Sequence, residues 1–274
     1  MDHMKYVKCL LCGREHGVRE TLYTCLDCGP SGVLDVVYDM NVVAKRWVRR
    51  RTHSDSLPAS IWRYQELLPV LDERYRPPLQ IGWTPLYPGA ELVKRYEQAE
   101  GIALPQNILI KDDGRNPTAS YKDRASAMAV MKAQELGKDV ITCASTGNAA
   151  SSLAGLAASL GIATYIFVPE SAPRSNVAQL IMFGAHVIMV NGSYDQAFDL
   201  CLQATEEWGW YSRNSGFNPY LGEGKKTGAL EVCEQLGWQV PDEVIVPVGD
   251  GCIIGGIWKG FCDLHELGLI DALP

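Results

Sequence analysis

The fold of this chain is decided by one stretch of sequence, Asn116-Pro117-Thr118-Ala119-Ser120-Tyr121-Lys122-Asp123-Arg124. An apolar run at 108–110 precedes it and predicts a buried strand. A helical pattern follows over 125–136, with apolar residues on one face and Gly137 as its end. We therefore expect Lys122 where a strand passes into a helix, in the first turn of that helix.

This position suggests a chemical role for Lys122. The positive end of a helix dipole disfavours a protonated amine, and the deprotonated amine is the form that attacks a carbonyl carbon. Lys122 is therefore a candidate for Schiff-base formation with a carbonyl compound. A solvated lysine on the surface is the alternative, and charge placement alone leaves both open.

The chain beyond residue 137 alternates between short apolar strands and helical patterns. Strands are predicted at 140–144, 163–168, 186–190 and 210–212, and helices at 149–160, 176–183 and 194–208. This alternation predicts an α/β fold with a parallel sheet and helices on both faces. The carboxyl ends of such strands meet at one edge, where ligands bind.

Two turns that follow predicted strands carry candidate ligand groups. Ser145-Thr146-Gly147-Asn148 offers hydroxyls and amides at a helix start, which suits a carboxylate or phosphate, although the same sequence is also typical of an ordinary helix cap. Gly249-Asp250-Gly251-Cys252-Ile253 follows a predicted strand at 243–247 and opens a helix to residue 267. Glycines there free backbone N–H groups to bind a phosphate. Because a carboxylate would repel that phosphate, we expect the Asp250 side chain to turn away.

Four cysteines near the N-terminus have the spacing of a metal site. Cys9-x-x-Cys12 and Cys25-x-x-Cys28 are separated by 12 residues, which predicts a structural zinc ribbon, with free thiols or an iron centre as alternatives. A closed four-sulfur site leaves no open position for a substrate. We interpret His16 as a solvated residue rather than as a ligand.

Composition narrows the possible partners. The net charge of −7, from 25 basic and 32 acidic residues, argues against nucleic acid as the main partner, and the run Arg49-Arg50-Arg51 is interpreted as a solvated helix face. Apolar runs stay below the roughly 18 residues of a membrane helix. Nine cysteines without a recognisable secretory signal favour a reducing cytoplasm.

Several of these motifs together resemble threonine synthases. Residues 116–124 resemble the segment that carries their pyridoxal-phosphate lysine, commonly Asn-Pro-Thr-Gly-Ser-Phe-Lys-Asp-Arg, with Ala119 and Tyr121 as the departures. Gly82-Trp83-Thr84-Pro85-Leu86 and residues 223–227 are also similar to segments of that family, although taken alone they predict a structural turn and a capped helix start with a solvated lysine pair. Zinc-ribbon starts occur in some threonine synthases.

The resemblance implies a fold and a division into domains. It implies two doubly wound sheets of the tryptophan synthase β-like class (fold type II of the pyridoxal-phosphate enzymes) and an N-terminal zinc ribbon. We expect the ribbon at 1–40, a cofactor domain at 41–124 and 214–274, and an inserted α/β domain at 125–213. Family members continue for roughly another hundred residues, about one domain. We therefore expect this chain to be a fragment whose cofactor domain is incomplete at its C-terminus.

The resemblance also implies site roles. Lys122 would hold pyridoxal 5'-phosphate and move protons as the catalytic residue. The substrate carboxylate would be held by Ser145, Thr146, Gly147 and Asn148, with Asn148 also touching the ring oxygen of the cofactor. The cofactor phosphate would be held by Gly249, Asp250, Gly251, Cys252 and Ile253, where Asp250 and Cys252 depart from the family pattern.

The function implied by the resemblance is conversion of O-phosphohomoserine and water to threonine and phosphate. Related pyridoxal-phosphate lyases or β-replacement enzymes are the nearest alternatives: threonine dehydratase, diaminopropionate ammonia-lyase and cysteate synthase. An alternative from a different class is a non-catalytic ligand-binding module. Relatives are commonly dimers, so a homodimer is one option for assembly that periodicity neither supports nor opposes.

Overall fold

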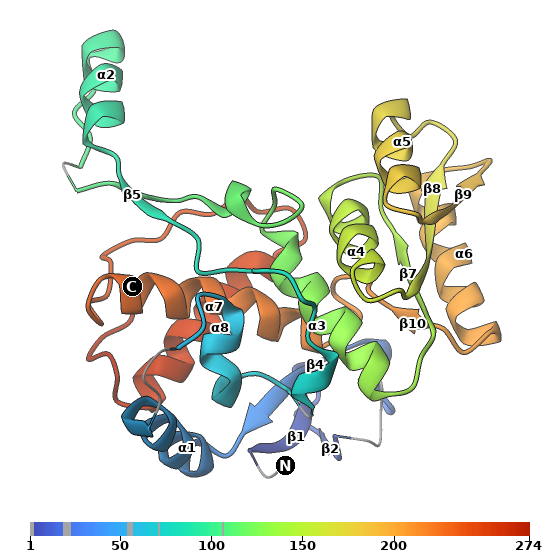
Figure 1. Ribbon diagram of the computed structural model, residues 1–274, viewed down its shortest axis with the longest axis horizontal. Coiled ribbons are helices and arrows are strands. Elements are labelled where there is room, and N and C mark those ends of the chain that lie inside the picture. The colour runs from blue at the N-terminus through green and yellow to red at the C-terminus, as the bar shows by residue number, and fades with distance from the viewer. Residues whose placement is uncertain (1–2, 19–22, 54–56, 71, 106) are drawn as a thin grey trace.

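The computed structural model describes residues 3–18, 23–53, 57–70, 72–105 and 107–274. Figure 1 shows three parts: an N-terminal ribbon in blue, a body of packed helices, and a separate α/β unit in yellow and orange. None of the helices described is long and apolar enough to span a bilayer. Helix α3, which begins at Lys122, contacts both the helical body and the α/β unit.

The N-terminal ribbon is an antiparallel sheet in the strand order β2-β1-β4-β3. Its strands are β1 (Met4–Cys9), β2 (Glu15–His16), β3 (Thr24–Cys25) and β4 (Gly29–Tyr38). Alternate residues of β4 are buried, and Leu34, Val36 and Tyr38 share one apolar cluster with residues of the helical body such as Leu230 and Phe261. The ribbon therefore shares its core with the body.

Three helices of the body lie in contact, with α7 between the other two. They are α3 (Lys122–Glu135), α7 (Tyr220–Gln235) and α8 (Cys252–Glu266), and α1 (Met40–His53) and the 3₁₀ segments η1 (Ile61–Leu67) and η2 (Glu73–Tyr75) lie around them. Glycines allow the close approach. A Cβ at Gly224 would lie 2.0 Å from the carbonyl oxygen of Arg124, and one at Gly260 would lie 2.5 Å from that of Lys226. These distances fix the position of α7 against both neighbours.

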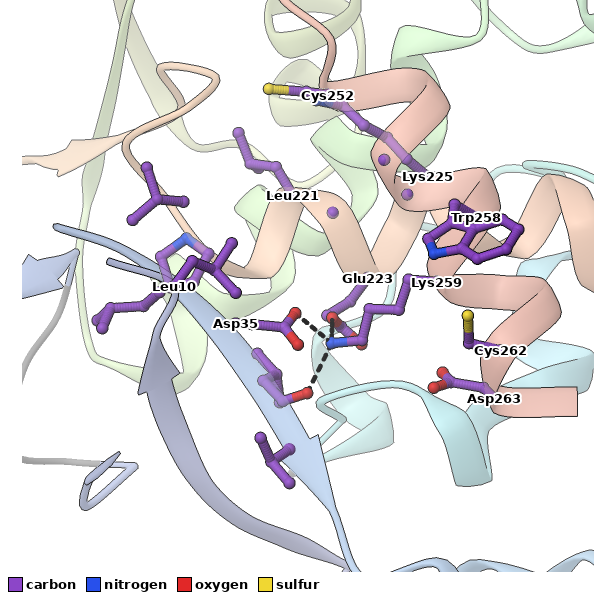
Figure 2. A pocket seen from close by; sticks show the side chains of 18 of the residues that line it. Leu10, Asp35, Leu221, Glu223, Lys225, Cys252, Trp258, Lys259, Cys262 and Asp263 are labelled. Atoms are coloured by element: carbon purple, nitrogen blue, oxygen red, sulfur yellow. Dashed lines mark hydrogen bonds and ion pairs between the residues drawn. The ribbon is translucent and has the colours of Figure 1, made fainter. Parts of the chain in front are cut away.

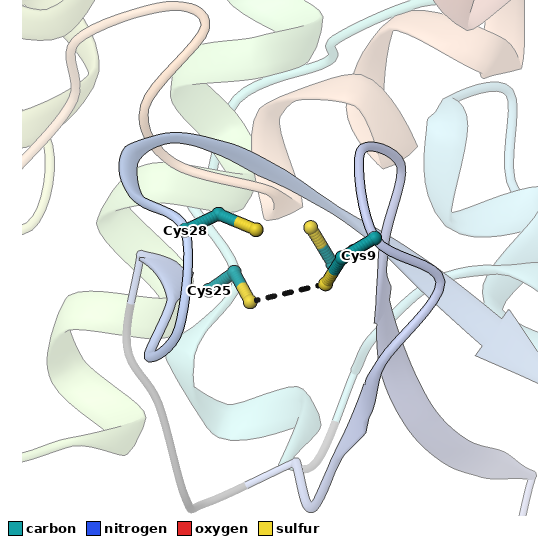
Figure 3. A group of neighbouring side chains, drawn as sticks. Cys9, Cys25 and Cys28 are labelled. Carbon is teal, nitrogen blue, oxygen red and sulfur yellow. Dashed lines mark hydrogen bonds between the residues drawn. The ribbon is translucent and has the colours of Figure 1, made fainter.

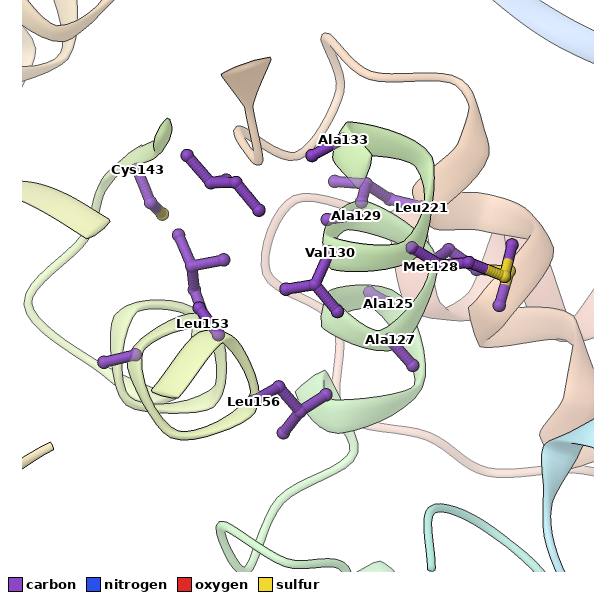
Figure 4. Close-up of a cluster of buried hydrophobic side chains, with 14 of the residues drawn as sticks. Ala125, Ala127, Met128, Ala129, Val130, Ala133, Cys143, Leu153, Leu156 and Leu221 are labelled. Atoms are coloured by element: carbon purple, nitrogen blue, oxygen red, sulfur yellow. The ribbon is translucent and has the colours of Figure 1, made fainter. Parts of the chain in front are cut away.

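The α/β unit confirms the predicted parallel sheet, in the order β10-β7-β8-β9. Its elements are β7 (Val140–Ala144), α4 (Asn148–Ala158), β8 (Ala163–Pro169), α5 (Arg174–Met182), β9 (His186–Val190), α6 (Tyr194–Glu207) and β10 (Tyr211–Ser212). Helix α6 covers one face of the sheet, and α4 and α5 cover the other. Figure 4 shows Ala129, Val130 and Ala133 of α3 in one apolar cluster with Leu153 and Leu156 of α4.

The second predicted sheet is not formed by the residues described. Strand β5 (Leu86–Pro88) pairs antiparallel with β6 (Leu109–Lys111), on either side of α2 (Ala90–Glu100), and η3 (Asp113–Arg115) follows. The run predicted as a buried strand is exposed, with Leu109 43% and Ile110 39% accessible. The predicted strand at 243–247 is not assigned as a strand, and Ile245 is 92% exposed. A strand needs a partner for its backbone groups, and no described segment pairs with 243–247.

Candidate active site

Helix α3 begins at Lys122, as predicted, and the turn before it is firmly held. The Asp123 carboxylate accepts hydrogen bonds from the backbone N–H of Thr118 at 2.7 Å and from its hydroxyl. The Asn116 side-chain oxygen accepts the N–H of Gly82 at 2.8 Å. Ala119 has a positive φ of 56°, a conformation that favours glycine. These bonds fix the backbone that presents Lys122.

The neighbour of Lys122, Tyr121, joins α3 to α7. Its hydroxyl donates to the carbonyl oxygen of Lys225 at 2.5 Å. Gly228 leaves room for the ring, because a Cβ there would lie 2.2 Å from that hydroxyl oxygen. Burial raises the pKa of Tyr121, which keeps the phenol protonated as a donor. The position of Lys122 is thus tied to the first half of α7.

Arg124 anchors the same helix on its other side. Its fully buried guanidinium pairs with Glu231 of α7 at 2.5 and 2.8 Å and with Asp113 at 2.8 and 2.9 Å. Thr84 joins this network through its hydroxyl, which donates to Asp113 at 2.6 Å. The contacts support the structural interpretation of the segment 82–86. Bidentate pairs of this kind fix the relative orientation of the two side chains in addition to pairing their charges.

The turn before α8 lies in the electrostatic neighbourhood of Lys122. The positive charges of Lys225 and Lys122 act on the carboxylate of Asp250, and the charge of Lys122 also acts on Lys225. Cys143, near the carboxyl end of β7, is affected by Lys122 and by Arg213, although burial dominates and raises its pKa to about 12. Lys122 is therefore within electrostatic range of Lys225, Asp250 and Cys143.

Asp250 does not turn away from this turn, and that prediction is wrong. Its carboxylate accepts the backbone N–H of Cys252, the first residue of α8, at 3.0 Å. Burial works against the charged carboxylate, but the Cys252 N–H and the charges of Lys225 and Lys122 outweigh it and lower the pKa of Asp250. The free N–H groups and the dipole of a helix start attract an anion, and Asp250 supplies one from within the chain.

The predicted substrate loop, Ser145-Thr146-Gly147-Asn148, connects β7 to α4 as expected. The Gly147 N–H donates to the Ser145 hydroxyl at 3.2 Å, and the Asn176 side chain donates to the Thr146 carbonyl at 2.7 Å. Asn148 is the exposed first residue of α4. These contacts hold the loop at the carboxyl edge of the sheet, while its ligand roles stay predictions.

The burial of three cations in this part of the molecule was missed from the sequence. Lys225, interpreted with Lys226 as a solvated pair, is 1% exposed, and Lys226 is fully buried. Arg213 follows β10 and is also fully buried. It donates to the hydroxyls of Ser126 at 3.1 Å and Ser215 at 3.2 Å, but its Nη2 has no partner in the described part of the chain. The spacing of Gly224 and Gly228, one helical turn apart, is the sequence signal that could have predicted burial of this part of α7.

These residues fit an anionic carbonyl cofactor such as pyridoxal phosphate. Lys122 supplies the amine, and the turn at 249–253 supplies backbone N–H groups at a helix start. Two buried polar groups of the region, Arg213 Nη2 and the Ser120 hydroxyl, have no partner among the residues described. Unsatisfied buried donors are expected where a ligand completes the bonding.

The four cysteines of the N-terminal ribbon come together as predicted. Their sulfur atoms all lie within 4.8 Å of one another, with 3.7 Å between those of Cys12 and Cys25, and all four are free thiols (Figure 3). A tetrahedral zinc site with bonds of about 2.3 Å separates its sulfurs by roughly 3.8 Å. The interpretation of His16 as solvated is wrong, because it is 1% exposed with its Nε2 3.3 Å from the Cys25 sulfur. The set fits one metal ion.

The arginine run of α1 is only partly solvated. Arg50 pairs with Glu66 at 3.2 Å and Arg51 with Glu234 at 2.9 Å, both half-buried, while Arg49 is exposed. These pairs attach α1 to η1 and α7. The interpretation of the run as a solvated face is therefore wrong for Arg50 and Arg51.

A cavity of about 530 Å³ opens between the ribbon, the start of α7 and α8. Its lining includes β4 residues such as Asp35, and Lys225 and Cys252 also border it (Figure 2). Lys259 also lines it, bonded to Asp35 at 2.5 Å and Glu223 at 2.7 Å. Lys225 and Cys252 thus connect the cavity with the region around Lys122.

Comparisons with known proteins agree on a family. The family described as "Pyridoxal-phosphate dependent enzyme" matches residues 78–268. The threonine synthase of Methanocaldococcus jannaschii is 41% identical over 268 residues, covering 97% of this chain and 63% of that protein. The threonine synthase of Methanosarcina acetivorans is 38% identical over 272 residues, covering 99% and 63%. The chain thus spans about 63% of the length of these relatives.

Solved structures show the same fold at low identity. The processed form of threonine deaminase isoform 2 from Solanum lycopersicum has a TM-score of 0.54 at 23% identity, covering 67% of this chain and 48% of that one. Maize serine racemase has a TM-score of 0.56 at 20% identity, covering 86% and 60%. At these identities the likeness concerns the fold alone.

Proposed function

This chain belongs to the family of pyridoxal-phosphate-dependent enzymes. We propose that it contains the part of a threonine synthase active site that includes the cofactor-binding lysine, Lys122. The reaction proposed is conversion of O-phosphohomoserine and water to threonine and phosphate. The observation that carries the proposal is the Lys122 amine at the start of α3, in electrostatic reach of the turn before α8. Similarity to threonine synthases over almost the whole chain supports the choice of substrate.

Lys122 has two tasks in this proposal. Its amine would hold pyridoxal phosphate at the carbonyl carbon, and as a free amine it would be the base that takes the proton from the substrate α-carbon and returns protons at the neighbouring carbons. The bond from Tyr121 to α7 holds the backbone beside it. When bound, the cofactor supplies a conjugated ring that accepts the electron pair left on the substrate.

The two turns orient the ligands. The loop Ser145-Thr146-Gly147-Asn148 would bind the substrate carboxylate through hydroxyls and N–H groups, and Asn148 would also help to hold the cofactor ring. The residues Gly249, Gly251, Cys252 and Ile253 hold phosphate through their N–H groups, together with that of Asp250. The four cysteines hold a structural zinc ion that stabilises the ribbon against α7 and α8.

Two spectroscopic and kinetic measurements test this function. Protein mixed with pyridoxal phosphate should show an absorbance band near the edge of the visible range that borohydride removes, and Lys122→Ala should lack it. Turnover of O-phosphohomoserine to threonine and phosphate should exceed deamination of threonine. A band that persists in Lys122→Ala would contradict the role of Lys122, and threonine deamination as the faster reaction would favour a dehydratase.

A further inference from the structure

Tyr23 of the N-terminal ribbon packs against the α/β unit. It lies two residues before Cys25, one of the four clustered cysteines. Its hydroxyl oxygen accepts the backbone N–H of Ser212, in β10, at 2.8 Å. Its ring stacks on that of Phe217 with 4.5 Å between the ring centroids, and it contacts Tyr211 in a tilted arrangement at 5.7 Å. The ribbon therefore contacts an edge strand of the parallel sheet.

The bond from Ser212 to Tyr23 takes the place of a further strand. Strand β10 is at the edge of the sheet, and its pairing with β7 is on the other side. Ser212 is fully buried, so its N–H has no access to water as a replacement acceptor. A buried N–H that loses its acceptor destabilises the arrangement around it. The Tyr23 hydroxyl thus helps to fix the end of β10.

Residues 212–214 connect β10 to strand β7 and helix α3. All three are at most 2% exposed. The backbone N–H of Arg213 donates to the carbonyl of Thr142 in β7 at 2.8 Å, and its Nε donates to the hydroxyl of Ser126 in α3 at 3.1 Å. A shift of this segment would therefore be felt on both elements.

Asn214 holds the residue that precedes the predicted substrate loop. Its side-chain oxygen accepts the backbone N–H of Ala144, the last residue of β7, at 2.9 Å. Its own N–H donates to the Ser212 hydroxyl at 3.2 Å. A continuous path of three hydrogen bonds therefore connects Tyr23 with the residue directly before Ser145.

We propose that Tyr23 is a positioning residue for the candidate active site. Through Ser212 and Asn214 it holds Ala144, and thereby orients the loop 145–148 for the carboxylate of an amino-acid substrate. The inference rests on the proposed function, which assigns the loop to that carboxylate. It gives the ribbon a part in substrate binding that involves no contact between ribbon and substrate.

Tyr23→Phe tests the inference, because it keeps the ring contacts and removes only the acceptor of the Ser212 N–H. Tyr96→Phe removes the same atom from an exposed position of α2 and is the control. Protein loaded with pyridoxal phosphate is titrated with O-phosphohomoserine, and the change in absorbance gives the dissociation constant. We expect Tyr23→Phe to raise this constant about fivefold, as loss of one hydrogen bond does, with affinity for pyridoxal phosphate unchanged. Tyr96→Phe should leave both values unchanged.

Amide hydrogen exchange gives a second readout that needs neither cofactor nor turnover. In Tyr23→Phe the amides of Ser212, Asn214 and Ala144 should exchange at least roughly threefold faster, while those of β8 keep their rates. An equal increase throughout the sheet would indicate a general loss of stability and would overturn the positioning role. Unchanged exchange at Ala144 would overturn it as well.

Variants of the other two links test whether the bonds act in series. Ser212→Ala removes the middle bond and leaves Tyr23 in place, so it should weaken substrate binding by a similar factor. The double variant Tyr23→Phe/Asn214→Ala should bind substrate no more weakly than Asn214→Ala alone. Fully additive losses in the double variant would contradict a shared path. Circular dichroism checks that each variant is folded.

Failure of this inference and failure of the proposed function are distinguishable. If Tyr23→Phe changes neither substrate affinity nor exchange at Ala144 while the Lys122-dependent absorbance band is present, the inference fails and the function stands. If no band depends on Lys122, the proposed function fails, and the exchange rates still decide the link. Faster exchange confined to Ser212, Asn214 and Ala144 then supports that link, and unchanged exchange overturns it.

Discussion

Two adjacent lysines of α7, Lys225 and Lys226, are both buried but have opposite surroundings. Lys226 lies 2.6 Å from Glu223 and 2.6 Å from Asp263. Lys225 has neither hydrogen bond nor ion pair among the residues described, and burial lowers its pKa to about 8. The comparison separates charge that holds the fold from charge available to a ligand.

The surroundings of Lys226 extend the contrast. Glu223 also accepts the Tyr38 hydroxyl at 2.6 Å and pairs with Lys259 at 2.7 Å, and Lys259 reaches Asp35 of the ribbon. This network connects the ribbon, α7 and α8 through carboxylates and amines that all have partners. Lys225, by contrast, pairs with no carboxylate in the described part of the chain.

The largest expected effect on stability comes from removing the ion pairs of Lys226. Lys226→Met leaves Glu223 and Asp263 buried without their shared cation, and should lower the free energy of unfolding by about 3–5 kcal/mol. Urea denaturation followed by circular dichroism measures this loss. A loss below about 1 kcal/mol would show that Lys226 is not the structural partner inferred here.

Replacing Lys225, which has no ion pair among the residues described, should instead increase the free energy of unfolding. Between about pH 8 and pH 10.5 the unfolded chain still binds the Lys225 proton that the folded protein has lost, so stability should rise with pH there. Below that range the buried charge is destabilising by roughly 3 kcal/mol, since each pKa unit is about 1.4 kcal/mol. Lys225→Met should therefore be more stable at pH 7 by up to roughly that amount, and less dependent on pH.

Urea denaturation of the unmutated protein and of Lys225→Met at pH 7 and pH 10 checks this result. The advantage of Lys225→Met should shrink at pH 10, where the folded protein is already deprotonated at Lys225. Equal destabilisation by Lys225→Met and Lys226→Met would remove the distinction between the two lysines.

The smallest expected effect on stability comes from the hydrogen bond between the Tyr121 hydroxyl, beside the start of α3, and α7. Tyr121→Phe removes the hydroxyl that donates to the Lys225 carbonyl and should cost about 1 kcal/mol, because the ring still fills the space beside Gly228. Thermal unfolding measures it, with Tyr96→Phe on the exposed face of α2 as the control. A loss as large as that of Lys226→Met would mean that this single bond organises the whole helix pair.

The sequence predicted features that depend on local pattern. The helix start at Lys122 and the parallel sheet of the α/β unit follow from hydrophobic periodicity and turn residues, and both were confirmed. The cysteine spacing likewise predicted a cluster that the sulfur positions confirm. In each case neighbouring residues along the chain contain the information needed.

Features that depend on distant partners were not predictable in this way. Leu109 and Ile245 are apolar, but periodicity does not reveal that no described segment covers them. Burial of Lys225 and Lys226 results from close packing at glycines of two helices, Gly224 and Gly228 of α7 and Gly256 and Gly260 of α8. The Asp250 carboxylate turns inward because a helix N–H and nearby cations attract it, and those cations come from other elements.

The most direct measurement of the central claim is to identify which lysine captures the cofactor. Lys225, with its lowered pKa, is the natural competitor of Lys122 for a carbonyl carbon. After borohydride reduction with pyridoxal phosphate, peptide mapping by mass spectrometry should locate the adduct on Lys122, both in the unmutated protein and in Lys225→Gln. An adduct on Lys225, or one spread over exposed lysines, would contradict the assignment of Lys122 as the reactive amine.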